Sequence, residues 1–141
     1  MSVWLKGSAL LGGVALTASL LASELPRTVA PEGAEVYFIS PADGDTVTSP
    51  VLVRFGLKGM GVAPAGVQMP NTGHHHLAVN HETPSLDQPI SNDILHFGGG
   101  QTETTLELEP GEHTLQLILG DYLHIPHDPA ILSETITITV E

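Results

Sequence analysis

The sequence contains no cysteine, which excludes a disulfide framework, a thiolate nucleophile and a zinc site built on cysteine. Basic residues are also scarce. Four Lys and Arg stand against sixteen Asp and Glu, for a formal net charge of -12. Because binding to phosphate backbones needs clustered positive charge, we expect no nucleic-acid partner. The acidic surface instead favours solubility and attracts cations.

The chain has only one long hydrophobic run, residues 7–22. This run is shorter than the ~20 apolar residues of a membrane-spanning helix, and it lies between Lys6 and the small residues Ala22 and Ser23. It predicts a signal peptide over 1–23 and export to the periplasm, followed by a linker over 24–34. Since Leu20 and Leu21 make an imperfect cleavage site, an uncleaved membrane anchor is the alternative.

After residue 34 the pattern is that of short strands separated by Gly and Pro. The last segment shows it best, with Ile136, Ile138 and Val140 alternating with threonines. Pro110 and Gly111 predict a tight hairpin between the fourth and fifth strands. The expected strands are 35–40, 51–58, 74–80, 102–108, 113–119 and 134–140. We therefore predict one all-β domain over 35–141, an immunoglobulin-like antiparallel β-sandwich of about six to seven strands.

Three of the eight histidines are consecutive, His74 to His76. Because alternate residues of a strand share a face, His74 and His76 should project together, with Cβ atoms roughly 6 to 7 Å apart. That spacing allows both imidazoles to bind one metal ion, while His75 should point with Leu77. A polar strand face with one core histidine explains the motif equally well.

A second group of histidines and carboxylates lies in the proline-stiffened loop 120–129, and His96 precedes a run of three glycines. Thioether and imidazole together favour copper, whereas imidazole with carboxylate also suits zinc. The candidate metal ligands are His74, His76, His124 and His127, with His96, Met60, Met69 and Asp128 in reserve. Either methionine could equally fill a gap in the core. No serine lies in a nucleophile elbow and no catalytic group of residues is evident, so an enzyme is not the favoured hypothesis.

Several segments together resemble a bacterial family called domain of unknown function 4399. These are GLKGMGVAPAG at 56–66, TGHHHL at 72–77, LHFGGGQTE at 95–103, HTLQLILGD at 113–121 and HIPHDP at 124–129. The resemblance extends over residues 35–141 and supplies no activity. It implies a compact β domain, usually exported, in which the triple histidine, the glycine run and the HIPHDP loop belong together.

The favoured hypothesis is a periplasmic metal-binding protein that carries or sequesters copper, with zinc possible. One alternative is a cell-envelope module that binds a protein or a glycan and uses its histidines structurally. Another is a redox enzyme with bound copper and an open coordination position. A shared metal site requires the histidines of 74–76 and the 124–129 loop to meet, and a separation above ~10 Å would exclude it.

Overall fold

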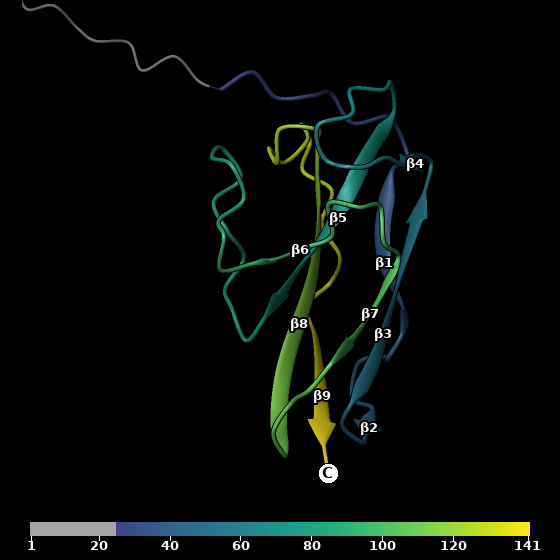
Figure 1. Cartoon of the computed structure of the whole chain (residues 1–141), viewed down its shortest axis with the longest axis vertical. Coiled ribbons are helices and arrows are strands. Elements are labelled where there is room, and N and C mark those ends of the chain that lie inside the picture. Colours follow the sequence, from purple (N-terminus) through teal and green to yellow (C-terminus); the bar gives the residue numbers. More distant parts are fainter. Residues whose placement is uncertain (1–24) are drawn as a thin grey trace, which may run out of the picture.

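The computed structural model describes residues 25–141, so the predicted signal peptide lies outside the described residues. The smaller of its two sheets contains β1 (Glu35–Ser40), β3 (Val51–Lys58) and β7 (Glu103–Leu106) in the order β1-β3-β7. Both pairings in it are antiparallel. Figure 1 shows this sheet on one side of the molecule, facing the second sheet across the core.

The larger sheet has the order β2-β9-β8-β5-β4, with β6 also paired to β5. Its long strands are β5 (Thr72–Val79), β8 (Gly111–Gly120) and β9 (Ile136–Val140), paired antiparallel in that order. The two-residue strands are β2 (Thr46–Val47), β4 (Gly61–Val62) and β6 (Leu95–His96). The predicted all-β sandwich is confirmed. No helix of the described chain is long and apolar enough to cross a membrane.

The main core lies between the two sheets and follows from the alternation in the sequence. Inward positions of the long strands are aliphatic or aromatic, and burying them from water supplies the main driving force for folding. The buried members of this core include Val53, Phe55, Leu77, Leu115, Leu117, Leu119, Ile136 and Ile138.

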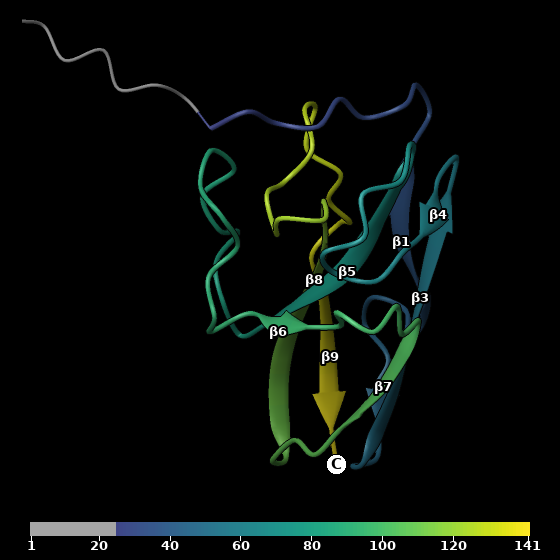
Figure 2. The ribbon, with the colours of Figure 1, turned by 45° about the horizontal axis from the view of Figure 1, so that its top comes forward.

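A second, smaller core lies on the outer face of the larger sheet. There Ala78 and Ile118 pack against Ile90 and Ile94 from the long excursion over 80–94. The excursion is also tied to the sheet by the Thr83 hydroxyl, which donates to Gln116 Oε1 at 2.8 Å. Figure 2 shows this excursion and the loop after β8 at the same end of the molecule, above β6. Two loops distant in sequence are thus brought to one edge of β5.

The hairpin expected at Pro110 and Gly111 is wrong. β7 pairs with β3 in the smaller sheet, whereas β8 pairs with β5 and β9 in the larger one. The connection therefore crosses from one sheet to the other, and the Leu108 amide donates to the Ser49 hydroxyl at 3.0 Å on the way. Because proline has no N–H to donate to a β-ladder, Pro110 is as compatible with a crossing between the sheets as with a hairpin.

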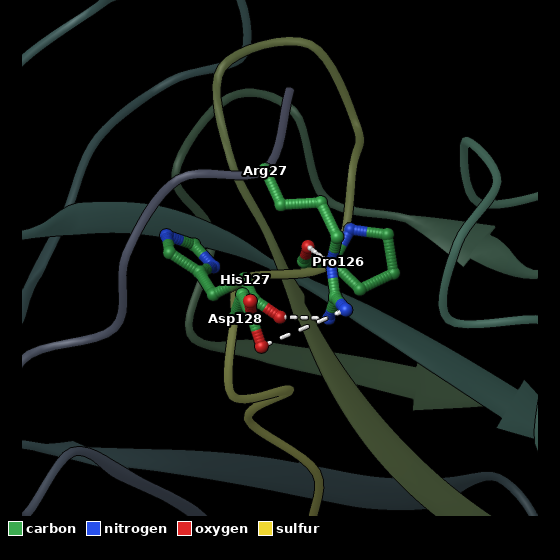
Figure 3. Close-up of polar contacts among 4 residues, drawn as sticks. All are labelled: Arg27, Pro126, His127 and Asp128. Carbon is green, nitrogen blue, oxygen red and sulfur yellow. Dashed lines mark hydrogen bonds and ion pairs between the residues drawn. The ribbon is translucent and has the colours of Figure 1, made fainter. Parts of the chain in front are cut away.

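The segment over 25–34, expected as a linker, lies against the domain. The backbone of Thr28 and Ala30 brackets Asp128 through two hydrogen bonds of 2.9 Å. Figure 3 shows the Arg27 side chain lying across the 126–128 loop. Its guanidinium donates to the carbonyls of Pro126 (3.1 Å) and His127, and approaches the Asp128 carboxylate at 3.7 Å. The segment thus fastens the loop that follows β8.

Candidate metal centre

Four histidines from three parts of the chain converge on the outer face of the larger sheet. His74 and His76 come from β5, His96 from β6 and His124 from the loop after β8. One ring nitrogen from each lies within 4.8 Å of those of the others. Two imidazoles on one ion can be at most ~4.2 Å apart, because each metal–nitrogen bond is ~2.1 Å. The longest separation must therefore shorten by at least about 0.6 Å, shared between two side chains, for the four to bind a single ion.

Strand β5 sets the direction of the three consecutive histidines. His74 and His76 point outward into the cluster, with ring centroids 4.7 Å apart. His75 points to the opposite side, into the core, where its ring lies 5.2 Å from that of Phe55. The register between β6 and β5 then places His96 directly opposite His76. The alternation of a strand accounts for this arrangement.

His124 reaches the cluster because a buried aspartate organises its loop. Asp121 Oδ1 accepts hydrogen bonds from the backbone N–H groups of Leu123 (2.8 Å) and Ile125 (3.0 Å), while Oδ2 accepts one from the Thr28 hydroxyl (2.8 Å). This is the local side chain-to-backbone pairing that holds a tight turn. His124 itself has a φ of 65°, in the left-handed region that few residues other than glycine adopt. Such strain is typical of functional loops.

The contacts among the ring nitrogens are more than hydrogen bonding can satisfy. Nε2 of His96 lies 3.1 Å from Nε2 of His74 and 3.0 Å from Nε2 of His124. An imidazole nitrogen has a single in-plane position, holding either a proton or a lone pair. It can therefore form only one of these two hydrogen bonds at a time. A cation between the rings would accept the lone pairs of all of them.

Three imidazoles of the cluster have lowered pKa values and are held neutral at neutral pH. Burial, followed by the neighbouring charges of His124 and His96, lowers the pKa of His74 to about 4, and Asp121 opposes this only in part. Burial, followed by the neighbouring charges of His74, His96 and His124, lowers the pKa of His76 to about 3. The pKa of His96 is also lowered, by burial and by His124. Neutral imidazole is the form that binds metals, so protons compete weakly for this site.

Two glycines make room for the imidazoles. A Cβ atom on Gly120 would lie 2.7 Å from Cε1 of His76, and one on Gly98 would lie 2.3 Å from Cε1 of His96. Real side chains do not approach this closely, so any larger residue would displace a ring. The first glycine of the 98–100 run therefore serves the histidine two residues before it.

The remaining candidate ligands lie elsewhere. His127 is fully buried and does not belong to the group of four; Figure 3 shows its imidazole pointing away from Arg27. Met60 packs against the main core, and Met69 is exposed and lines a different cavity of about 350 Å³. Asp128 is exposed and paired with Arg27. The cluster thus contains His124 from the 124–129 loop together with His96, rather than both loop histidines.

Sequence reasoning did not identify the residues that support the cluster. The sequence places Asp121 only among the carboxylates of the 120–129 loop, and it assigns no role to Arg27 or Gly120. The available signal was the run G-D-x-x-H after an inward-facing strand, since Asp is favoured where its side chain caps a turn. Arg27 had no signal, because its contacts lie about 100 residues away along the chain.

The comparisons with known proteins identify a family and no activity. The model of the family described as domain of unknown function 4399 matches residues 53–141, which include all four histidines of the cluster. No curated protein and no solved structure matches the chain.

Proposed function

The chain belongs to the family described as domain of unknown function 4399, and we propose that it is an exported metal-binding protein with copper as its preferred ion. The proposal is carried by the four ring nitrogens that converge within 4.8 Å. Buried polar groups normally have hydrogen-bond partners, and here the neutral rings cannot all satisfy one another. A bound cation removes that deficit.

The donor set supports copper over the other divalent ions. All four donors are imidazole nitrogens, which suit copper and zinc, and copper binds most tightly in the divalent series. The methionines give no added support for Cu(I), since Met60 packs in the core and Met69 lies at another cavity. Zinc therefore remains the competing ion, and the two are separated by their measured affinities.

A role in carrying or sequestering the ion fits the graded exposure of the cluster. His74 and His76 are buried, His124 is half-buried and His96 is exposed. An ion could therefore enter and leave from the side of His96 while two buried ligands hold it in place. Export would bring such a domain to the cell envelope, and the predicted signal peptide over 1–23 is the support for that step.

The test is a titration of the purified chain with Cu(II), Cu(I) and Zn(II). One ion per chain should bind, and His96→Ala should weaken binding at least about tenfold, because it removes a ligand from the exposed side with little effect on the core. His124→Asn removes a second ligand and keeps a residue that tolerates positive φ. His81→Gln is the matched control, since His81 is exposed and pairs instead with Asp93.

Binding no tighter than micromolar, or equal binding by His96→Ala and the control, would refute the metal proposal. That result would favour the alternative of an envelope interaction module with structural histidines. Preference for Zn(II) over Cu(II) at equal free concentrations would keep the site and overturn the choice of copper.

A further inference from the structure

A cavity of about 260 Å³ opens directly beside the histidine cluster. Three of the four candidate ligands form one wall of it, His76, His96 and His124. The other walls come from the 80–94 excursion and from the loop after β8, and consist of Pro89, Ile90, Ser91, Asn92, Ile94 and Leu123. A water molecule takes ~30 Å³ in the liquid, so the space suits a small ligand rather than a drug-sized one.

The cavity is a built feature of the fold. The backbone N–H of Ile90 donates to the carbonyl of His124 at 2.8 Å, which joins the excursion to the loop that carries a candidate ligand. Ile90 and Ile94 are held in the small outer core with Ile118. The excursion that forms one wall of the cavity is therefore attached both to the loop of His124 and to the larger sheet.

An ion in the cluster would keep part of its positive charge. Its four ligands are neutral imidazoles and bring no negative charge with them. The closest buried carboxylate, Asp121, can offset one unit, but both of its oxygens already accept hydrogen bonds from Thr28, Leu123 and Ile125. A divalent ion would thus retain about one uncompensated positive charge in a half-buried place, where an unpaired charge is costly.

No lysine or arginine among residues 25–141 lines the cavity, so within this part of the chain a metal ion would be its only cationic group. The hydroxyl of Ser91 and the amide of Asn92 are the polar groups on the excursion side. Aspartate 93, which also lies on the excursion, is turned to His81 at 2.6 Å and does not line the cavity. The walls therefore neither supply a competing charge nor repel an anion that approaches the metal.

We propose that the divalent form of this centre takes a small inorganic anion as an additional ligand, held in the cavity between the histidines and the 80–94 excursion. This inference rests on the proposed metal site. The anion binds the metal through one atom, offsets the remaining positive charge and has its far end among Ile90, Ile94 and Leu123. It makes the centre one with an exchangeable coordination position, open to a small anionic ligand or substrate.

The experiment uses the chain loaded with one equivalent of Cu(II) in chloride-free buffer and titrated with sodium azide. Binding is followed by the azide-to-copper charge-transfer absorption and by the change in the Cu(II) electron paramagnetic resonance spectrum. Wild-type protein should show saturable binding of one azide, and the metal-free protein should show none. Leu123→Trp should weaken azide at least about tenfold, because the indole would occupy the cavity.

The matched control is Leu52→Trp, at an exposed position of β3 on the other sheet. It should bind azide as the wild type does, and both variants should keep the azide-free Cu(II) spectrum. No charge-transfer band with Cu(II) bound, or equal azide affinity in Leu123→Trp and wild type, would overturn the inference while leaving the metal site intact. Failure to bind stoichiometric Cu(II) before azide is added would instead refute the proposed function, and this inference with it.

Discussion

Histidine 75 gives the sharpest test of how the buried imidazoles affect stability. It is fully buried on the core face of β5, next to Phe55. Neither ring nitrogen has a hydrogen-bond partner of normal geometry among the described residues. Burial lowers the pKa of His75 to about 4, and the backbone of Gln101 opposes this only in part. The folded chain therefore holds this ring neutral at pH values where the unfolded chain protonates it.

The difference in His75 protonation between the folded and unfolded chain makes the stability depend on pH. Between pH 6.5 and about 4 the unfolded state binds more protons than the folded state, so stability falls as the pH falls. Each pH unit below 6.5 costs about 1.4 kcal/mol, which gives about 2 kcal/mol at pH 5 and almost nothing at pH 7.5. Replacing His75 with leucine removes the titrating group and keeps an apolar side chain in the core.

The measurement is urea unfolding of the metal-free wild type and His75→Leu at pH 7.5 and pH 5. The variant should gain about 2 kcal/mol relative to the wild type on going from pH 7.5 to pH 5, whatever the offset at pH 7.5. Such a change is a large fraction of a typical domain stability of ~5–15 kcal/mol. An offset between the two proteins that is the same at both pH values would refute the reasoning.

Three further predictions address the supporting contacts. Gly120→Ala should weaken metal binding at least about tenfold by displacing His76, whereas Gly61→Ala, whose added Cβ meets nothing closer than 3.6 Å, should titrate like the wild type. His81→Gln should lower the melting temperature at pH 6 and leave it unchanged at pH 9. Hydrogen bonds to the Glu82 carbonyl and then to Asp93 raise the pKa of His81. The contact of His81 with Asp93 therefore stabilises the fold below that pKa, and this stabilisation is lost above it. Equal effects of the substitution at both pH values would contradict this. Arg27→Ala should lower the melting temperature by on the order of 5 °C in calorimetry, and Arg27→Lys should recover only part of it, because lysine lacks the fork of donors.

Much of the fold could be predicted because strand alternation is a local property. The buried faces of the 51–58 and 134–140 segments follow from their period of two, as does the opposite direction of His75 and its two neighbours. Strand pairing is not local. The positions of Pro110 and Gly111 predict a turn equally well whether the chain pairs back on itself or crosses to the other sheet, as it does here.

The histidine cluster likewise has one part that local strand alternation predicts and another that depends on non-local pairing. That His74 and His76 share a face could be predicted from the strand alone. The other two members depend on the pairing of β6 with β5 and on the left-handed φ of His124, neither of which is encoded in the spacing of histidines. His127 was an equal candidate with His124, and the turn held by Asp121 decides between them.

The position of β5 between β8 and β6 has a consequence for the order of assembly. His74 and His124 are fifty positions apart in the chain, and they meet only after β5 has paired with β8 and the following turn has closed. An unfolded chain carries the same imidazoles, but nothing holds the four of the cluster within reach of one ion. Metal would therefore bind the folded chain more tightly than the unfolded chain and stabilise it by up to about 2.7 kcal/mol at a free concentration one hundred times the Kd. The thermal stability of the domain would then report how much of it is loaded.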